Sequence, residues 1–330
     1  MPTRITVLGA GSWGTALAKL LVEAGHEVVL WARRDDLVRE VNERHENARY
    51  LPRTLLPPGL RATADLAACV VGVDLVLSVV PVQSSREVWA QIRPALPATA
   101  PVVSASKGIE TQSTKTMAEV LDEVLPGHPS AVLAGPSFAK EVARRLPTAV
   151  VVASSRPEVG TKVQEQFRTD YFRTYTSNDV VGVEVGGALK NVVAIAAGAA
   201  DGMGFGHNTR AALITRGLAE ITRLAVRKGA NPLTLAGLSG LGDLVLTCTG
   251  DLSRNRTVGL GLGRGRKLDQ ILAEMTEVAE GVKTTLAAHV LGERLGVELP
   301  ITTEVYRMLY EDKPVRDVVS DLMRRGLRAE

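Results

Sequence analysis

The sequence predicts an α/β domain with a doubly wound, mainly parallel sheet, followed by an all-α C-terminal domain. Short runs rich in Val, Ile and Leu alternate with amphipathic segments through the first half of the 330 residues. A glycine motif joins the first run to the first amphipathic segment. After about Ser177 the Val-rich runs thin out, and Ala, Leu and Gly recur at helical spacing. We therefore expect one domain over residues 1–178 and a second over residues 179–330.

The N-terminal domain begins with a predicted strand, helix, strand and helix, over residues 5–8, 15–24, 28–32 and 37–44. Further buried strands are expected over 75–80, 102–105, 131–134 and 149–152, with helical stretches such as 116–124 between them. Their short, continuous, Val-rich character is typical of a parallel sheet that is covered on both faces. The sequence therefore predicts a sheet buried between two layers of helices.

The second domain is expected to consist of helices. Asn208 is expected to cap a long helix that runs to Lys228, and Asn231-Pro232 looks like the cap and first turn of the next helix. The apolar run 192–200 has about half of the roughly 20 residues that a membrane span needs, and the chain start lacks a signal-peptide pattern. We therefore expect a cytoplasmic protein without stable membrane insertion.

The composition argues against several kinds of site. The two cysteines, Cys69 and Cys248, form no Cys-x-x-Cys pair, and no His-Glu-x-x-His motif occurs, so neither a disulfide framework nor a metal site is predicted. We expect two ordinary buried thiols. The formal net charge is +3, and basic residues are interspersed with acidic ones rather than gathered into a stripe. This pattern favours a small anionic substrate over nucleic acid.

The glycine motif Gly9-Ala10-Gly11-Ser12-Trp13-Gly14 follows the first predicted strand and opens the first helix. In Rossmann domains the first glycine permits the tight turn, the second lets a pyrophosphate approach the backbone, and the third lets helix and strand touch. The N–H groups at the helix start then bind the phosphates. Because the motif lies between the right elements, we expect it to bind a nicotinamide dinucleotide rather than to form a plain turn.

The end of the second predicted strand bears on the choice of cofactor. About 20 residues after the glycine motif, NAD enzymes place an acid for the ribose 2′-OH, whereas NADP enzymes place an arginine for the 2′-phosphate. Arg33 and Arg34 occupy this position; Asp35 and Asp36 follow one step later, where they could instead cap the next helix. The sequence therefore favours NADPH, with NADH as the alternative.

Two polar side chains stand out in the helical domain. Lys190 directly precedes the apolar run, so it lies at the edge of a helix that should be buried. Either it has a function there, or its ammonium group reaches the surface along the helix. Asp243 lies among small and apolar residues. If it lies near Lys190, its expected role is to orient the lysine by a hydrogen bond.

The segment Ser253-Arg254-Asn255 lies at a predicted helix start. Helix-terminal N–H groups, an arginine fork and an asparagine amide together match the geometry of a phosphate. The same residues also suit an ordinary capped helix with solvated arginines. The spacing alone leaves both interpretations open.

These motifs resemble those of the bacterial-type NAD(P)-dependent glycerol-3-phosphate dehydrogenase family, and the resemblance runs essentially from end to end. The matching segments are, in order, 9–14, 80–84, 106–110, 134–139, 189–192, 240–244, 253–255 and 279–281. The resemblance implies reduction of dihydroxyacetone phosphate to sn-glycerol 3-phosphate, the backbone precursor of glycerophospholipids, by hydride transfer from NAD(P)H. It also implies a homodimer.

The resemblance implies roles for individual residues as well. Lys190 matches the family's acid/base, and Lys107 and Asp243 complete the expected catalytic group. The residues expected to contact the substrate are Lys107, Gly135, Ser137, Lys190, Asp243, Ser253, Arg254 and Asn255. Those expected to contact the cofactor are Gly9, Gly11, Ser12, Trp13, Gly14, Arg33, Arg34, Tyr50, Lys107, Ala139, Arg254, Val278 and Glu280. No metal is expected.

Other functions are compatible with parts of the sequence. Ser137 and Lys140, like Ser104 and Lys107, satisfy the Ser-x-x-Lys pattern of serine hydrolases, but the companion Ser-Asp-Asn and Lys-Thr-Gly motifs are absent. A reductase of a 2-keto or 3-hydroxy acid would share the fold, but it needs one carboxylate clamp rather than a site for a more highly charged anion. A dinucleotide-sensing regulator would not need the lysine and aspartate of the helical domain.

Overall fold

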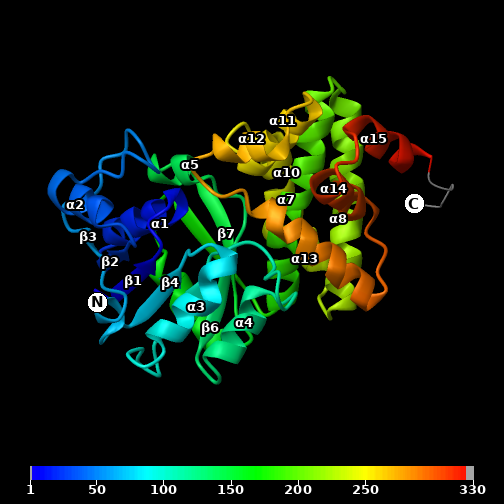
Figure 1. Ribbon diagram of the computed structural model, residues 1–330. Coiled ribbons are helices and arrows are strands. Elements are labelled where there is room, and N and C mark those ends of the chain that lie inside the picture. The colour runs from blue at the N-terminus through cyan, green and yellow to red at the C-terminus, as the bar shows by residue number, and fades with distance from the viewer. Residues whose placement is uncertain (1, 325–330) are drawn as a thin grey trace. The chain divides into compact units, whose positions relative to one another are not determined.

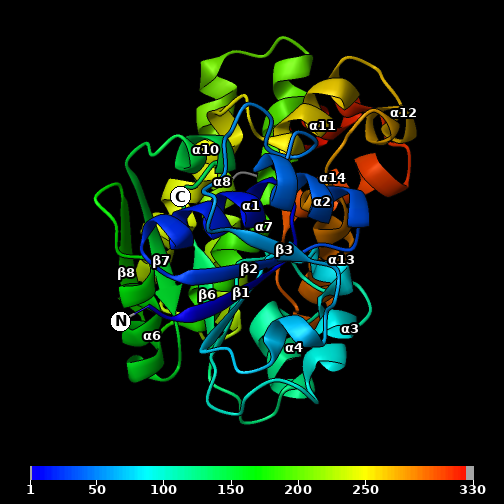
Figure 2. The same cartoon turned by 90° about the vertical axis from the view of Figure 1, so that its left-hand side faces the viewer.

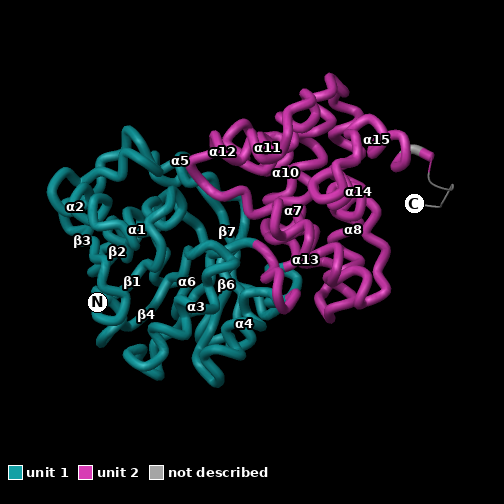
Figure 3. Tube along the Cα trace, in the orientation of Figure 1, with its two compact units in different colours: residues 1–107, 115–184 teal, residues 108–114, 185–330 magenta. Residues whose placement is uncertain are grey.

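The computed structural model describes residues 2–324. Contacts within the chain divide it into two compact units, coloured separately in Figure 3: unit 1 comprises residues 1–107 and 115–184, and unit 2 comprises residues 108–114 and 185–330. Unit 1 contains the sheet, and unit 2 is built from helices. The last passage from unit 1 to unit 2 lies within the helix Val180–Gly202, whose first residues belong to unit 1.

An eight-stranded sheet forms the centre of unit 1 within the described residues (Figure 1). Its order is β3-β2-β1-β4-β5-β6-β7-β8, and every neighbouring pair is parallel except β6 with β7. The first six strands in this order have the doubly wound Rossmann arrangement, so the predicted α/β fold with a mainly parallel sheet is confirmed. The strands are β1 (Arg4–Leu8), β2 (Glu27–Trp31), β3 (Arg61–Thr63), β4 (Leu75–Ser78), β5 (Val102–Ser104), β6 (Ser130–Ala134), β7 (Thr148–Ala153) and β8 (Phe172–Ser177).

The helices of unit 1 cover both faces of the sheet. They are α1 (Ser12–Glu23), α2 (Asp35–Arg44), α3 (Val82–Ile92), α4 (Met117–Val124), α5 (Ala139–Ala143) and α6 (Pro157–Gln166). Ile5 and Val7 pack into a core with α1, whereas Leu8 and Val76 belong to the core with α3 and α4. Figure 2 shows α1 and α2 on one side of β1 to β3 and α3 and α4 on the other. Side chains that alternate along each strand produce these two cores.

Two strands, β3 and β8, lie outside the predicted set. β3 has only three residues, which are too few to show a periodicity. β8 alternates buried residues such as Phe172 and Thr174 with exposed ones such as Arg173 and Tyr175, because it lies at the edge of the sheet. Because most residues of β8 are polar, the strand does not form the continuous apolar run by which the other strands were predicted.

In the described part of unit 2 the regular structure is entirely helical (Figure 1), so the predicted all-α second domain is confirmed. Asn231 caps α9 as predicted, because its side chain accepts a hydrogen bond from the Leu233 N–H at 3.0 Å. The elements are α7 (Val180–Gly202), α8 (His207–Arg227), α9 (Pro232–Leu235), a π-helical turn (Leu238–Gly242), α10 (Asp243–Thr249), α11 (Arg254–Gly263), α12 (Leu268–Ala273), α13 (Glu280–Leu295), α14 (Pro300–Tyr310) and α15 (Val315–Met323).

Two stretches of the described chain have the length and hydropathy of a membrane span. The first is α7, and 83% of its most apolar window is buried inside the protein, where Val192 and Ile195 join the core of unit 2. The second, Pro232–Thr249, is interrupted by the π-helical turn and consists of three short pieces. α7 is therefore the central core helix of unit 2.

The start of α8 differs from the prediction. The helix begins at His207, and its N-cap is Gly206, whose backbone is extended at φ −84° and ψ −173°. Asn208 lies inside the first turn, so the prediction that it caps the helix is wrong. Glycine also serves at N-caps, which is why a search for polar caps selected the wrong residue. The predicted end is correct within one residue, since α8 ends at Arg227 and Gly229 follows with φ +96°.

Both cysteines are buried and reduced, as expected. Burial raises the pKa of Cys69 to about 12 and that of Cys248 to about 12. Because the thiolate is the reactive form, neither thiol is a nucleophile at neutral pH. Within residues 2–324 no group of three or more His, Cys, Asp or Glu side chains could hold a metal ion.

Four glycines bring α7 and α11 into backbone contact. Gly198 and Gly202 lie on α7, and Gly259 and Gly263 lie on α11; we call these four residues the glycine seam. A Cβ atom at Gly202 would lie 2.9 Å from the Cα of Gly263, and one at Gly259 would lie 2.7 Å from the Ala199 nitrogen. Residues four apart share one face of a helix. The seam therefore lets the two helices approach more closely than side chains would allow.

Replacing Gly198 by alanine is expected to lower the free energy of unfolding by about 1–3 kcal/mol, the usual cost of overpacking. The new methyl group would overlap the carbonyl oxygen of Arg256 on α11. Gly160→Ala is the matched control, because Gly160 also lies inside a helix, α6, and the nearest atoms to a Cβ there are 3.9 Å away, an ordinary contact. Urea unfolding of both variants tests this, and equal stability of the two would contradict close contact at the seam.

Candidate active site

The glycine turn between β1 and α1 has the geometry that the motif predicts. Gly9 has φ +108°, and a Cβ there would lie 2.8 Å from the carbonyl oxygen of Val79. A Cβ at Gly14 would overlap the carbonyl oxygen of Gly9. Gly11 is different, because a Cβ there would meet no atom within 4 Å. The first and third glycines thus shape the turn, while the second faces open space where a phosphate can approach the backbone.

Asn47 braces this turn and was not among the predicted residues. It is fully buried, and its amide nitrogen donates to the carbonyl oxygen of Ala10 at 3.0 Å and to the hydroxyl of Thr15 at 2.8 Å. Its own carbonyl oxygen accepts from the Tyr50 N–H at 3.2 Å. Asn47 therefore ties the glycine turn to the segment that carries Tyr50. No local pattern around Asn47 predicts its contact with the turn, since Ala10 and Thr15 lie 37 and 32 residues away in the chain.

Trp13 and Ala139 pack against the same small apolar cluster of Ala16, Leu51 and Ala143. The indole N–H of Trp13 is buried and has no hydrogen-bond partner among the described residues. An unsatisfied buried donor is costly unless a ligand or water accepts from it. Together with the open space at Gly11 and the N-terminus of α1, this donor fits a dinucleotide site on unit 1.

Arg33 and Arg34 lie exposed just after β2. Arg34 is the N-cap of α2, and its guanidinium binds the carboxylate of Asp36 through two hydrogen bonds. This pairing lowers the pKa of Asp36 to about 2. Asp35 and Asp36 occupy the first turn of α2, so the interpretation that they cap this helix is wrong. Their carboxylates instead favour the positive end of the helix dipole.

Three residues predicted to contact the substrate meet in unit 1. The Lys107 ammonium donates to the carbonyl oxygen of Gly135 at 2.9 Å, and the Ser137 hydroxyl donates to the same oxygen at 3.0 Å. Gly135 has φ +138°, and a Cβ there would lie 2.9 Å from the Cα of Val150. Ser104, from the serine-hydrolase pattern, is fully buried in β5 and cannot meet a substrate.

Lys190 is buried in α7 with 7% of its surface exposed, so the alternative that its ammonium group reaches the surface is wrong. Its Nζ donates to the Asp243 carboxylate at 2.6 Å and to the Thr247 hydroxyl at 2.7 Å. The hydrogen bond expected between Lys190 and Asp243 is therefore present. Thr247 was not predicted; it lies one turn after Asp243 on α10, which is the signal that could have found it.

Glycines explain how Asp243 reaches Lys190. Asp243 begins α10 directly after the π-helical turn, and such turns are frequent at functional sites. A Cβ at Gly240 would overlap the carbonyl oxygen of Leu235, and one at Gly186 would lie 2.8 Å from the carbonyl oxygen of Ser239. Small residues on both sides thus let the turn lie directly against α7, which presents the carboxylate to the lysine.

The segment Ser253–Asn255 adjoins the chain next to Lys190. Ser253 caps α11, because its hydroxyl accepts from the Arg256 N–H at 3.2 Å. The Asn255 amide donates to the Asn191 side-chain oxygen at 2.9 Å, and its oxygen accepts from the Gly281 N–H at 2.9 Å. Asn255 therefore joins α11 to α7 and α13. Because Asn191 follows Lys190 directly, the lysine and the start of α11 belong to one region of unit 2.

Arg254 follows the cap of α11, and its side chain is 45% exposed. It donates to the Glu277 carboxylate at 2.7 Å. Glu277 belongs to the loop that leads to the predicted cofactor residues Val278, which is exposed, and Glu280, the first residue of α13. The arrangement keeps both interpretations of this segment open: Ser253 does cap the helix, and the Arg254 guanidinium reaches solvent, where an anion can meet it.

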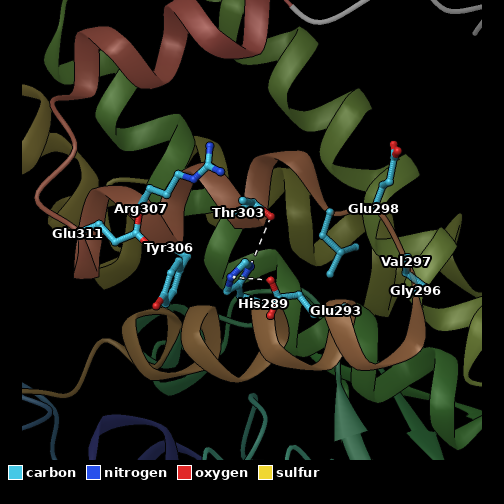
Figure 4. A pocket seen from close by; sticks show the side chains of 11 residues that line it. His289, Glu293, Gly296, Val297, Glu298, Thr303, Tyr306, Arg307 and Glu311 are labelled. Atoms are coloured by element: carbon cyan, nitrogen blue, oxygen red, sulfur yellow. Dashed lines mark hydrogen bonds and ion pairs between the residues drawn. The ribbon is translucent and has the colours of Figure 1, made fainter.

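A cavity of about 410 Å³ lies between the end of α13 and α14 (Figure 4). The ring of His289 stacks on Tyr306 with 4.2 Å between centroids, and its Nε2 lies 3.6 Å from the Glu293 carboxylate. The described residues that line this cavity include none of those predicted to contact substrate or cofactor. The candidate functional groups are therefore the glycine turn and Gly135 in unit 1, and Lys190 and the start of α11 in unit 2.

Comparisons with known proteins cover the whole chain. The family model described as NAD-dependent glycerol-3-phosphate dehydrogenase N-terminus matches residues 4–160, and its C-terminus counterpart matches residues 179–320. The chain is 57% identical over 333 residues to glycerol-3-phosphate dehydrogenase (NAD(P)+) of Geobacter sp. (strain M21), covering 100% of this chain and 99% of that protein. It is 57% identical over 330 residues to the protein of the same name in Myxococcus xanthus (strain DK1622), covering 99% and 98%. The crystal structure of glycerol-3-phosphate dehydrogenase from Coxiella burnetii superposes with a TM-score of 0.95 at 41% identity, covering 98% of this chain and 99% of that one.

Proposed function

Since the chain belongs to the NAD-dependent glycerol-3-phosphate dehydrogenase family, we propose that Lys190 is the acid/base with which it interconverts dihydroxyacetone phosphate and sn-glycerol 3-phosphate. The reaction is a hydride transfer that uses NAD(P)H. The observation that carries the proposal for Lys190 is its buried ammonium group, held by the Asp243 carboxylate at 2.6 Å and the Thr247 hydroxyl at 2.7 Å.

When bound, the reduced nicotinamide supplies the hydride for the ketone carbon. Negative charge then develops on the ketone oxygen, so a proton donor must stand beside it. Lys190 donates this proton as an ammonium group in the reduction. In the reverse direction Lys190 must be neutral so that it can accept the proton of the alcohol.

We assign Asp243 an orienting role rather than that of the base. Its carboxylate accepts a hydrogen bond from Lys190, which fixes the direction of the ammonium group. The Thr247 hydroxyl donates to the Asp243 backbone oxygen at 2.6 Å, so it presents its own lone pairs to Lys190 as an acceptor. Both contacts restrict the lysine to one rotamer.

The substrate's phosphate is proposed to bind at the start of α11. Arg254 offers a fork of N–H donors, and the first N–H groups of α11 add the positive end of its dipole. The remaining proposed substrate contacts are those of Lys107, Gly135, Ser137, Lys190, Asp243, Ser253 and Asn255. Asn255 acts there mainly by holding Asn191 and Gly281, since its amide bonds to both.

The cofactor is proposed to bind unit 1, with NADPH preferred over NADH. Support comes from the open space at Gly11, the buried donor of Trp13 and the two arginines after β2. The full set of proposed cofactor contacts is Gly9, Gly11, Ser12, Trp13, Gly14, Arg33, Arg34, Tyr50, Lys107, Ala139, Arg254, Val278 and Glu280. Because Arg34 is already paired with Asp36, Arg33 is the first choice for the 2′-phosphate.

Arg33→Ser is expected to lower the ratio of kcat/KM for NADPH to kcat/KM for NADH by about 10-fold or more, because a charge-assisted hydrogen bond contributes about 1.5–3 kcal/mol. The matched control is Arg39→Ser, which removes an exposed arginine that lies on α2. Initial rates with each cofactor give the ratio. An equal ratio in wild type and Arg33→Ser would remove Arg33 from the cofactor site.

We further propose that the protein is cytoplasmic, forms a homodimer and supplies glycerol 3-phosphate for glycerophospholipid synthesis. Gel filtration with light scattering tests the dimer. These proposals rest on the family to which the chain belongs.

The direct test of the function follows the absorbance of reduced nicotinamide in a mixture of protein, NADPH and dihydroxyacetone phosphate. The absorbance is expected to fall only when all three are present. Oxidation of NADPH by a 2-keto acid but not by dihydroxyacetone phosphate would identify a different reductase. NADPH binding without turnover of either compound would identify a dinucleotide-sensing regulator.

A further inference from the structure

We infer that Asp201 is a positioning residue, which holds the first turn of α11 so that Arg254 can receive the phosphate of the substrate. Asp201 lies near the end of α7, and its side chain is 7% exposed. It lies eleven residues beyond Lys190 in the chain and is assigned no role in the reaction itself. The inference rests on the proposed function, because it requires Arg254 to bind the phosphate.

Asp201 joins three helices through two arginines. Its Oδ1 accepts from Arg210 on α8, with Nε at 3.1 Å and NH2 at 2.7 Å. Its Oδ2 accepts from the Nε of Arg256 on α11 at 3.0 Å, and the NH2 of Arg256 lies 2.8 Å from the same oxygen as an ion pair. Each carboxylate oxygen therefore lies within 3.1 Å of two nitrogens of one guanidinium. A buried carboxylate between two planar forks has few alternative geometries, so it fixes both arginines.

Because Arg256 is held by Asp201, it fixes the helical turn on which Arg254 also lies. It is 15% exposed, it lies in the same first helical turn as Arg254, and its backbone N–H is the one that Ser253 caps. Its carbonyl oxygen lies against Gly198, where a side chain would overlap it. The first turn of α11 is thus held by its backbone at the glycine seam and by its Arg256 side chain at Asp201.

A second contact between α11 and α7 lies closer to the proposed proton donor. Asn255 bonds to Asn191 beside Lys190, so α11 is attached to α7 near both the proton donor and the seam. The separation between the Lys190 ammonium and the Arg254 guanidinium must match the length of a triose phosphate. Misplacement of a substrate by about 1 Å can cost about 100-fold in rate. The contacts of Asp201 with Arg210 and Arg256, which we call the Asp201 lock, hold α11 against α7. They therefore control whether the phosphate can bind at Arg254 while the reacting carbon lies beside Lys190.

Asp251 offers a matched comparison, because it binds the same guanidinium from the outside. Its carboxylate accepts from Arg256 NH1 at 2.9 Å, but its side chain is 95% exposed. It makes no contact with Arg210 among the interactions described for the two arginines. Asp201→Asn and Asp251→Asn thus remove the same charge from the same arginine. Only the first also replaces one of the two acceptor oxygens that join the helices by an amide NH2 group, which cannot accept from an arginine.

The test measures kcat and both KM values for Asp201→Asn and Asp251→Asn. Asp201→Asn is expected to raise the KM for dihydroxyacetone phosphate by about 10-fold or more. A smaller rise is expected in the KM for NADPH, because Arg254 is also a proposed cofactor contact. Asp251→Asn is expected to change neither by more than about twofold, because exposed pairs contribute little. By charge alone, loss of either carboxylate would help an anion bind and would lower the KM. A lower KM in both variants would therefore overturn the inference.

Arg254 connects the effect to the phosphate. Arg254→Ala raises the same KM, and adding Asp201→Asn to it is expected to cause little further rise, since the group being positioned is already gone. Full additivity of the two effects would show that Asp201 does not act through Arg254. A purely structural loss would lower kcat through less active protein and would leave the KM unchanged, which would also refute the inference.

Should Asp201→Asn fail to fold, Arg210→Gln replaces it. This variant removes the α8 side of the lock and retains the Asp201 to Arg256 bonds, so a smaller rise in the same KM is expected. An unchanged KM for dihydroxyacetone phosphate in Arg210→Gln would contradict the proposed role of Asp201. Wild-type protein is assayed first: its inactivity would refute the proposed function and the inference together, whereas an active wild type with an unaltered KM in the variants would refute the inference alone.

Discussion

Replacing Lys190 by alanine is expected to lower kcat by about 10²–10⁴-fold, the range that general acid–base catalysis contributes. The reason is that the ammonium group is the proposed proton source for the developing alkoxide, whereas Asp243 and Thr247 accept hydrogen bonds from it. The dissociation constant of NADPH, measured by fluorescence titration, is expected to stay nearly constant. A parallel loss of kcat and of NADPH affinity would contradict the role.

Two further variants separate proton transfer from charge and from stability. Lys190→Arg keeps a positive charge but holds its proton throughout the accessible pH range, so it is expected to be nearly as inactive as alanine. Removing the lysine also withdraws the ammonium group from the buried Asp243 carboxylate, which costs about 3–5 kcal/mol of stability. The double variant Lys190→Ala with Asp243→Asn removes both charges, and Lys267→Ala serves as an exposed control in unit 2. Activity in Lys190→Arg close to wild type would point to electrostatic help alone.

Gly14→Ala is expected to lower stability, whereas Gly11→Ala is expected mainly to lower the affinity for NADPH. A methyl group at Gly14 would overlap the carbonyl oxygen of Gly9, so the turn between β1 and α1 must open, and we expect the free energy of unfolding to fall by about 3 kcal/mol, the upper end for overpacking. At Gly11 a methyl group meets no atom within 4 Å, and the backbone has φ −69°, which any residue adopts. Gly11→Ala is therefore expected to lower the free energy of unfolding by at most about 1 kcal/mol, because Gly11 is the N-cap of α1 and alanine is a poorer cap.

Cofactor binding separates these two glycines further. The methyl group of Gly11→Ala would occupy the space through which the pyrophosphate approaches the backbone, so the dissociation constant of NADPH is expected to rise by about 100-fold, or roughly 2.8 kcal/mol. Urea unfolding and fluorescence titration of both variants check the two effects. NADPH binding to Gly11→Ala with the wild-type constant would mean that the dinucleotide lies elsewhere.

The fold was predictable because its signals are local. The order of Val-rich runs and amphipathic segments contains the alternation of strand and helix, and the turn at Gly9 requires residues only a few positions apart. The same reasoning missed β3 and β8, whose sequences are too short or too polar to show a period. It also misplaced the N-cap of α8, because Gly206 lacks the polar side chain by which N-caps are usually identified in a sequence.

The candidate site was predictable only in part, since most of its contacts join distant segments. Lys190 could be singled out next to an apolar run, yet burial alone decided between a surface and an interior ammonium group. Asn47 and Asp201 have no local signature, because their partners lie elsewhere in the chain. The burial of Lys190 and the roles of Asn47 and Asp201 could therefore be assigned only from their neighbours in the folded structure.

The concealed thiols of Cys69 and Cys248 make the chain a convenient scaffold for fluorescent labelling. With a pKa of about 12 each, they stay protonated at neutral pH and shielded from maleimide dyes. One cysteine introduced at an exposed site such as Arg39, close to the arginines after β2, would then be the sole attachment point without deletion of either natural residue. The emission of that dye could follow dinucleotide binding in real time, independently of turnover.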